Sequence, residues 1–348
     1  MNPPLNRPEP ILHHAAPGVD RSVPAAQAAQ RLRDGEQLMV TDWYGTGEEI
    51  LARLEALLPP LPLQAPFEER QVRRRVRRAA ILRLLVSVEE QKLVLRDGRP
   101  LGFHKELYPE GGAFALPFAQ VQELAGAWNR YRDGVHLAVL GYAVHPFYGA
   151  YAPTRTSHLE LFATWLRSFP GKRTRAIDVG TGCGPLALML CRAGFERVLA
   201  TDINPNAIES VRRERARFLP PPPIDLFCGD LLGDDLRPAE LIVFNPPWIR
   251  GEAEGLLDEA LNYDDSLFER FFDQVCARLT PEGRVVLIFS NIMSLVQPDA
   301  PHPILAELAR GRLRLVQKLD RKVEPPRAPD GTRRRTRERV EVWELARA

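Results

Sequence analysis

The chain has 348 residues, of which 45% are hydrophobic and 26% charged, a composition typical of a globular protein of one large or two ordinary domains. The formal net charge of +2 gives no global attraction to nucleic acid or membranes, so such a partner must be argued from local patches. The four cysteines form no CxxC pair and no zinc spacing, the N-terminal sequence MNPPLNRPEP has no signal pattern, and no run of about 18 apolar residues occurs. We therefore expect a cytoplasmic protein with reduced thiols, no membrane span and no metal.

The first part of the chain mixes helical and strand patterns. We expect a loose proline-rich arm over residues 1–23 and an α+β domain over residues 24–145, which is a candidate for substrate recognition. Apolar spacing predicts helices, a hairpin turning at Asp97-Gly98 and a buried strand. The helices are expected over 23–35, 46–58, 67–88 and 119–134, the hairpin over 92–103 and the strand over 135–144.

The helix predicted over 67–88 contains the basic stretch RRRVRR, Arg73–Arg78. An apolar stripe runs along this helix, and the arginines fall on its remaining faces; the stripe consists of Val72, Val76, Ala79 and Ala80. The arginines are candidates for nucleic-acid contact. The alternative is a solvated face on which they pair with nearby glutamates.

From about residue 155 strands and helices alternate regularly. Strands are predicted over 175–180, 197–203, 224–230, 239–247, 284–291, 313–319 and 339–346, with helices over 157–169, 185–194, 206–219, 266–279 and 302–311. This alternation predicts an α/β fold with a doubly wound, seven-stranded, mostly parallel sheet. No helix separates the last two strands, so we expect an antiparallel C-terminal hairpin joined by a loop of about residues 321–338.

The segment DVGTGCGP, residues 178–185, lies where the first strand of this pattern turns into a helix. Gly180, Gly182 and Gly184 permit positive φ and a close approach of the backbone to a ligand, although an ordinary tight turn would use them too. A dinucleotide fingerprint would need Gly or Ala where Pro185 stands, so a nicotinamide oxidoreductase is disfavoured. The pattern Asp-x-Gly-x-Gly-x-Gly instead resembles the first motif of class I S-adenosylmethionine-dependent methyltransferases.

Acidic residues lie at the ends of the next two predicted strands. Asp202 can accept from both hydroxyls of a ribose, and together with Asp178 and Asp230 it would lie at one crevice, because the carboxyl ends of parallel strands meet there. The resemblance implies that Asp178 orients the methionine end of S-adenosylmethionine and that Asp230 accepts from the adenine amino group. The cofactor-binding residues expected from it are Asp178, Gly180, Thr181, Gly182, Gly184, Asp202, Ile203, Asp230, Leu231 and Asn245.

The fourth strand ends in FNPPW, residues 244–248. Asn-Pro-Pro-aromatic resembles the signature of amino-methyltransferases that act on adenine N6, cytosine N4, guanine N2 or the glutamine amide. Such a nitrogen is a poor nucleophile because its lone pair is delocalised. The Asn245 amide oxygen and the Pro246 carbonyl, held by Pro247, would accept from its two N–H groups, and Trp248 would stack on the planar group. These four residues are the expected catalytic residues.

The segment VHPFYGAYAPTRTSHLEL, residues 144–161, resembles an element that closes over the cofactor in HemK-type protein-glutamine and RsmC-type ribosomal-RNA methyltransferases. Thr154, Arg155 and Thr156 are the candidates for this role, and an interdomain connector is the alternative. The resemblance covers about residues 150–348, so we expect a methyltransferase domain over residues 146–348.

The predicted function is N-methyl transfer from S-adenosylmethionine to an RNA base, a protein glutamine or a small-molecule amine. A catalytically silent module that binds a partner is the alternative from another class. The stretch RRRTRER, Arg333–Arg339, lies in the last loop, and residues 321–339 hold eight basic and three acidic side chains. This loop is a second candidate for contact with nucleic acid, or else a charged loop without a partner.

Overall fold

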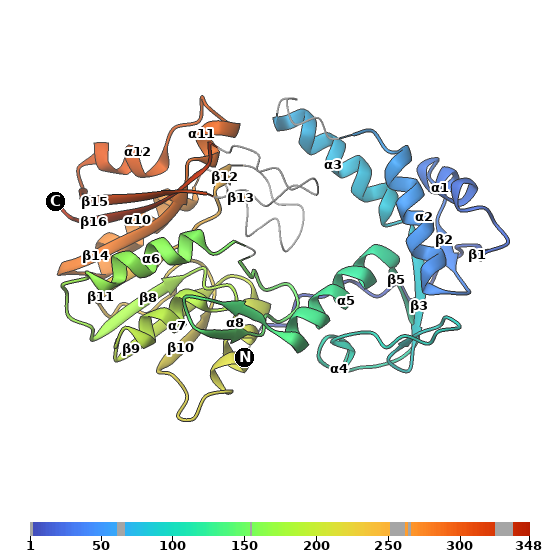
Figure 1. Cartoon of the computed structure of the whole chain (residues 1–348), viewed down its shortest axis with the longest axis horizontal. Coiled ribbons are helices and arrows are strands. Elements are labelled where there is room, and N and C mark those ends of the chain that lie inside the picture. Colours follow the sequence, from blue (N-terminus) through green and yellow to red (C-terminus); the bar gives the residue numbers. More distant parts are fainter. Residues whose placement is uncertain (1–2, 61–66, 154, 251–261, 264–265, 324–336) are drawn as a thin grey trace. The chain divides into compact units, whose positions relative to one another are not determined.

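The computed structural model describes residues 3–60, 67–153, 155–250, 262–263, 266–323 and 337–348 (Figure 1). The chain divides into two compact units, Asn6–Arg130 and Tyr131–Ala348 together with Met1–Leu5. No helix in the described ranges is long and apolar enough to cross a membrane.

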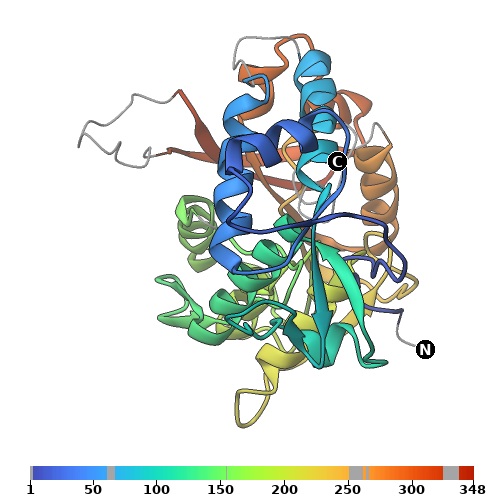
Figure 2. The same cartoon turned by 90° about the vertical axis from the view of Figure 1, so that its right-hand side faces the viewer.

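The first unit contains a five-stranded sheet, whose longer strands are drawn in teal in Figure 2. Its strands are β1 (Gly18–Val19), β2 (Leu38–Val40), β3 (Leu84–Glu89), β4 (Lys92–Leu93) and β5 (Phe114–Pro117). β1, β2 and β3 are parallel, whereas β4 and β5 both pair antiparallel with β3. The helices are α1 (Ala25–Arg33), α2 (Tyr44–Leu57), α3 (Phe67–Ile81), α4 (His104–Leu107) and α5 (Phe118–Asp133).

The proline-rich segment before α1 is bonded to this unit at several points, and β1 of the sheet is part of it. The backbone of Ile11 exchanges hydrogen bonds with Ala115 of β5, and the Tyr108 hydroxyl donates to the Pro8 carbonyl at 2.9 Å. These bonds tie residues 8–11 to the unit.

Two predictions about single elements are wrong. The helix expected over residues 67–88 ends at Ile81, because Leu84–Glu89 form strand β3, whose apolar residues are buried and include the β-branched Val86 and Val88. The strand expected over residues 135–144 is a short hairpin of β6 (Val135–Leu137) and β7 (Tyr142–Val144). Its chain reverses at Gly141, whose φ of 72° is in the left-handed region that favours glycine.

Helix α3 does not bury its valines. Val72 and Val76 are 57% and 56% exposed, and only Ala80 of the stripe is buried. Arg73 and Arg77 instead donate to backbone carbonyls just beyond the end of α2, at Pro60 and at Leu58 and Pro59. Two of the basic side chains in Arg73–Arg78 are thus used inside the first unit.

The second unit confirms the predicted sheet. Seven strands lie in the order β10-β9-β8-β11-β14-β16-β15, parallel except for β16. They are β8 (Arg175–Val179), β9 (Arg197–Asp202), β10 (Ile224–Cys228), β11 (Ala239–Phe244), β14 (Leu279–Ser290), β15 (Leu313–Lys322) and β16 (Arg339–Arg347). β16 lies between β14 and β15, so the predicted C-terminal hairpin is confirmed.

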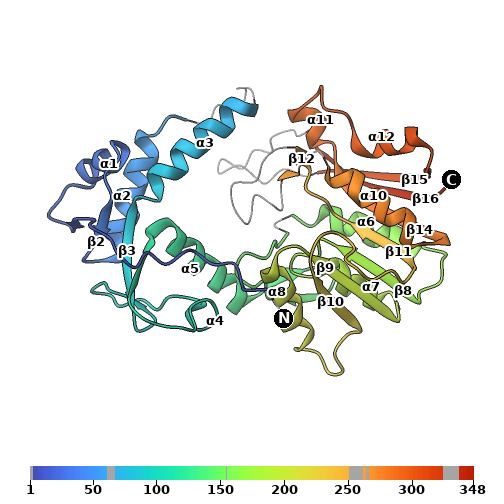
Figure 3. The ribbon, with the colours of Figure 1, turned by 180° about the vertical axis from the view of Figure 1, so that it is seen from behind.

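Helices cover both faces of this sheet (Figure 3). One hydrophobic cluster joins the strands to α6 (Ser157–Arg167), α7 (Pro185–Arg192) and α8 (Pro205–Arg215). The other joins them to α10 (Leu267–Arg278), α11 (Ile292–Val296) and α12 (Pro303–Arg310). Neighbouring strand residues such as Ala176 and Ile177 belong to opposite clusters, as the alternation of side chains along a strand requires. A short pair of strands, β12 (Ile249–Arg250) and β13 (Asn262–Tyr263), follows β11.

Candidate active site

The carboxyl ends of four strands bring the predicted site residues to one edge of the sheet. Val179 at the end of β8 is paired with Thr201 on one side and Phe244 on the other, and Asp202 is paired with Cys228. The glycine loop, the two strand-end aspartates and the FNPPW segment follow directly after these residues. The sheet therefore assembles at one edge what is separated along the sequence.

The glycine loop needs its glycines. Gly180, Gly182 and Gly184 have φ of 63°, 56° and 90°, a region that other residues rarely adopt. A Cβ on Gly182 would lie 2.9 Å from the Tyr151 carbonyl oxygen, and a Cβ on Gly184 would lie 3.0 Å from Val211. At Gly182 the loop can pass this close to Tyr151 only because the residue has no side chain.

Asp178 is fully buried beneath the loop. Its Oδ2 accepts from the Thr181 hydroxyl at 2.7 Å and from the Ala187 backbone N–H at 3.0 Å. Its Oδ1 is buried and has no hydrogen-bond partner in the described part of the chain. Burial, with a smaller contribution from the charge of Asp202, raises the pKa of Asp178 to about 7, against the opposing effect of its two hydrogen bonds.

Asp202 joins the glycine loop to the end of β9. Its carboxylate accepts from the Gly182 N–H and from the Asn204 N–H, each at 2.9 Å. The next side chain, Ile203, is 66% exposed, which is unusual for an isoleucine at the end of a buried strand. Asp202 thus shapes the loop as well as being a candidate ligand for a ribose, a structural role that the sequence did not reveal.

Asp230 and Leu231 lie in the loop after β10. Asp230 is exposed, and its carboxylate lies 3.5 Å from the Arg270 guanidinium of α10. Leu231 is buried and has a φ of 48°, so the chain turns sharply there and directs Asp230 outward. Both residues are at the predicted edge of the sheet.

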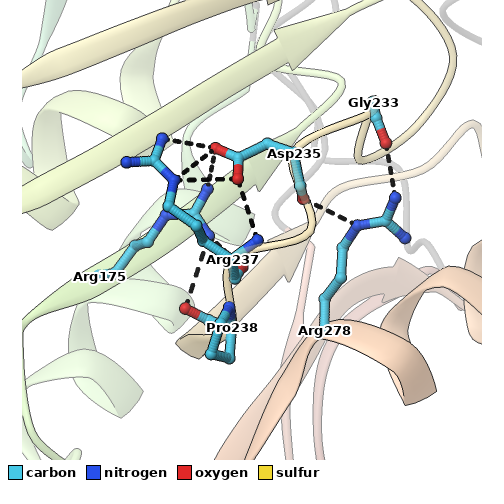
Figure 4. A network of polar contacts seen from close by, with 6 residues as sticks. All are labelled: Arg175, Gly233, Asp235, Arg237, Pro238 and Arg278. Atoms are coloured by element: carbon cyan, nitrogen blue, oxygen red, sulfur yellow. Dashed lines mark hydrogen bonds and ion pairs between the residues drawn. The ribbon is translucent and has the colours of Figure 1, made fainter.

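A polar network at the far end of this loop holds it in place (Figure 4). The Arg278 guanidinium donates to the Gly233 carbonyl at 2.7 Å and to the Asp235 carbonyl at 3.0 Å. The Asp235 carboxylate accepts hydrogen bonds from the Arg175 guanidinium at 2.7 Å and from the Arg237 guanidinium at 2.6 Å. Hydrogen bonds from Arg237, assisted by the charge of Arg175, lower the pKa of Asp235 to about 2. The network is a scaffold for the Asp230 loop.

The FNPPW segment presents a buried acceptor. Phe244 packs on Phe271 with ring centroids 4.8 Å apart, which fixes the end of β11. Asn245 Oδ1 is buried, and no described residue donates a hydrogen bond to it. Pro246 is buried and Pro247 half-buried, so the backbone that carries Asn245 is rigid.

Trp248 is half-buried and is held at two points. Its indole N–H donates to the Ile288 carbonyl of β14 at 3.3 Å. Its ring meets His158 of α6 edge-on, with centroids 5.9 Å apart and planes at 87°. Burial lowers the pKa of His158 to about 4, so this imidazole is neutral at pH 7. Sequence reasoning missed His158, because 90 residues separate it from Trp248.

The segment before α6 is fastened to the glycine loop and to α8. The side chains of Asn206 and Asn204 donate to the carbonyls of Tyr148 and Gly149 at 2.8 and 2.9 Å, and the Cys183 N–H donates to the Tyr151 carbonyl at 3.0 Å. The two asparagines occur in DINPN, directly after Asp202, and this was the available signal for their role.

The structure places the three residues proposed to close over the cofactor differently. Thr154 lies outside the described residues. Arg155 is ion-paired with Glu338 at 2.9 Å, and the Thr156 hydroxyl bonds Glu160 at 2.9 Å. In the described parts of the chain, no three His, Cys, Asp or Glu side chains are grouped closely enough to hold a metal ion.

Residues 160–298 match the family model described as the methyltransferase small domain. No curated protein sequence matches the chain significantly. Similar solved structures include a ribosomal protein L11 methylase from Lactobacillus delbrueckii subsp. bulgaricus, at 21% identity over 57% of this chain and 81% of that one with a TM-score of 0.39. A precorrin-6y C5,15-methyltransferase from Geobacter metallireducens matches at 15% identity over 57% and 93% with a TM-score of 0.39. A tRNA m1G37 methyltransferase from M. jannaschii matches at 16% identity over 57% and 51% with a TM-score of 0.38. The matched residues contain the glycine loop, Asp202, Asp230 and FNPPW.

Proposed function

We propose that this chain transfers a methyl group from S-adenosylmethionine to a planar, conjugated nitrogen of an RNA base or a protein glutamine. The observation that carries the proposal is the buried Asn245 Oδ1 with no donor among the described residues. A buried acceptor left unpaired costs about 1–3 kcal/mol, and an N–H group of the acceptor substrate would remove this cost.

The glycine loop and the two strand-end aspartates fit the cofactor. Gly180 and Gly182 hold the loop in the left-handed conformation, and beneath it Asp178 Oδ1 has no hydrogen-bond partner among the described residues. Asp202 would accept from the ribose hydroxyls, and the exposed Ile203 and the Leu231 turn offer apolar surface for adenine beside Asp230. When bound, S-adenosylmethionine supplies an electrophilic methyl group on a sulfonium.

The FNPPW segment would bind and orient the acceptor nitrogen. Asn245 Oδ1 accepts from one N–H and the Pro246 carbonyl from the other, and these two dipoles stabilise the positive charge that develops on nitrogen. Trp248 offers a planar face to the conjugated group, while Ile288 and His158 limit rotation of its ring. The chain needs no general base of its own to bind the acceptor in this way.

Two alternatives remain distinct from this proposal. A small-molecule N-methyltransferase would use the same edge, and nothing at Asn245 separates it from an enzyme acting on macromolecules. A silent binding module would have no reason to keep a buried acceptor unpaired. The buried Asn245 Oδ1 therefore favours an enzyme.

Calorimetric titration with S-adenosylmethionine tests the first half of the proposal. Transfer of a labelled methyl group into fractionated lysate, measured separately in RNA, protein and small molecules, tests the second. We expect binding in the micromolar range and label in one fraction on nitrogen. Absence of binding at millimolar cofactor would rule out a methyltransferase. Label on carbon or oxygen would rule out the role proposed for Asn245.

A further inference from the structure

A charged surface lies at the base of the β15–β16 hairpin. Its cations are Arg321, Lys322, Arg337 and Arg339 of the hairpin and Arg155 just before α6, and we call these five residues the basic edge. It is defined only by residues that the structure describes.

The sheet register places the basic edge beside the candidate active site. β14 is parallel to β11 and ends at Ser290, which is paired with Val340 of the antiparallel strand β16. Arg339 at the start of β16 is paired with Lys322 at the end of β15. The base of the hairpin is therefore at the carboxyl edge of the sheet, where β11 continues into FNPPW.

One short stretch of β14 and its continuation holds both features. The Ile288 carbonyl accepts the Trp248 indole N–H at 3.3 Å. Asn291, three residues later, donates from its side chain to the Arg337 carbonyl at 3.1 Å and accepts from the Arg339 N–H at 2.7 Å. The stacking face proposed for the acceptor and the backbone of the basic edge are thus fixed to the same strand end.

Three ion pairs fasten the hairpin base internally and to α6. Arg321 pairs with Glu160 at 2.8 Å, Arg155 with Glu338 at 2.9 Å, and Arg339 with Asp320. No described carboxylate is paired with Lys322 or Arg337, whose side chains are exposed. The pairing leaves these two cations for a ligand from solution.

We propose that the basic edge binds the phosphate backbone of a nucleic acid whose base is the methyl acceptor. A nucleobase carries a planar amino nitrogen and is joined to phosphates in the same molecule, whereas a glutamine side chain brings no anion of its own. The planar-nitrogen site at Asn245 and Trp248 and the cations at Lys322 and Arg337 therefore match the two halves of one nucleotide chain. The inference rests on the proposed function, because it assigns the substrate class of the same site.

The test neutralises the two unpaired cations and compares them with an equal change at the opposite edge. The variant is Lys322→Gln/Arg337→Gln, and the control is Lys172→Gln/Arg197→Gln, two exposed cations at the amino ends of β8 and β9. Binding of a fluorescent single-stranded RNA of mixed sequence, and of DNA of the same sequence, is measured by anisotropy over a range of salt concentrations. Thermal melts of both variants verify that they are folded.

Wild type should bind RNA, DNA or both in a salt-dependent manner, and the preferred probe identifies the kind of nucleic acid. Neutralising Lys322 and Arg337 should reduce the slope of log affinity against log salt by about 1.5, whereas the control should retain the wild-type slope. Equal slopes in the two variants, or no binding of either probe by wild type, would overturn the inference. So would methyl label in protein that both variants transfer equally well.

These outcomes are separable from a failure of the proposed function. If S-adenosylmethionine does not bind but the salt dependence of nucleic-acid binding still depends on Lys322 and Arg337, the proposed function is wrong and the nucleic-acid surface is supported. If the cofactor binds and a protein is methylated, the methyltransferase function is supported and nucleic-acid binding by the basic edge is wrong.

Discussion

Asp178 and Asp235 belong to the same domain, yet their pKa values are shifted in opposite directions. Asp178, at the carboxyl edge of the sheet, is buried with one oxygen unpartnered among the described residues, and its pKa is raised to about 7. Asp235 is held by Arg237 and Arg175 near the amino end of β8, and its pKa is lowered to about 2. Arginine donors solvate the Asp235 carboxylate, whereas the Asp178 carboxyl is solvated only in part.

This difference distinguishes residues that stabilise the fold from residues of the candidate active site. The arginines around Asp235 donate to carboxylate and carbonyl oxygens of the loop, and these bonds stabilise the fold. Asp178 and Asn245 each keep a buried oxygen without a donor in the described ranges, which costs stability. Stability is given up where we propose that ligands bind, as is common at active sites.

The largest expected effect is on catalysis at the carboxyl edge. Asn245→Ala should lower kcat for methyl transfer roughly 100- to 1,000-fold, because it removes an acceptor aimed at developing charge. Affinity for S-adenosylmethionine, measured by calorimetry, should stay near the wild-type value, and the melting temperature should not fall. The matched control is Asn291→Ala, whose side chain is already bonded to Arg337 and Arg339 and whose loss should lower the melting temperature. Equal losses of turnover and cofactor affinity in Asn245→Ala would make that residue structural.

The second prediction uses the opposite pKa shifts. The folded protein retains the Asp178 proton up to about pH 7, whereas the unfolded chain releases it near pH 4, so this group lowers stability progressively as pH rises between these values. Asp178→Asn should remove that loss, so its stability relative to wild type should rise from pH 4 to pH 8, by at most about 4 kcal/mol.

Asp235→Asn should show the reverse dependence. The low pKa of Asp235 means that its contribution is complete above about pH 4 and disappears as pH falls toward 2. This variant should therefore be destabilised at neutral pH and approach wild type in acid. Chemical denaturation at several pH values measures both variants, and parallel pH profiles would remove the contrast between the two carboxyls.

A smaller effect is expected from Arg278→Met. The variant loses the two bonds to the carbonyls of Gly233 and Asp235, and its unfolding free energy should fall by about 1–3 kcal/mol with kcat unchanged below the melting transition. Arg310→Met, which removes only an exposed pair with Glu269, should cost less than about 1 kcal/mol. If Arg278→Met reduced kcat without loss of stability, the Figure 4 network would belong to the active site instead of supporting it.

The smallest effect is expected at His158. His158→Ala removes the edge contact with Trp248, worth about 0.5–1.5 kcal/mol, and should raise KM for the acceptor several-fold with little change in kcat. His158→Phe keeps an aromatic edge and should restore KM. A shift of the pH profile in His158→Ala would show that the imidazole also moves a proton, against its position as a neutral packing partner.

The sequence predicted the sheet of the second unit well because its signals are local. Glycines at a strand end, an Asp near the ends of β8, β9 and β10, and paired prolines carry their conformational meaning within a few residues. Asn204, Asn206 and His158 escaped prediction because their roles depend on contacts with segments that the fold brings from elsewhere. The helix over residues 67–88 was overextended because an apolar run does not show where helix gives way to strand.

The position of β16 has a consequence for how the domain is assembled. β15 is an edge strand whose neighbour in the sheet is β16, and β16 fills the gap between β15 and β14. During synthesis β15 is made before β16, so β15 can join the sheet only after β16 has been made and has paired with β14. A chain ending before residue 339 would leave β14 with an open edge, and a separately supplied peptide of residues 337–348 would be the natural complement. The domain could therefore be divided before residue 337 into two fragments, and recovery of its activity would show that the fragments have associated.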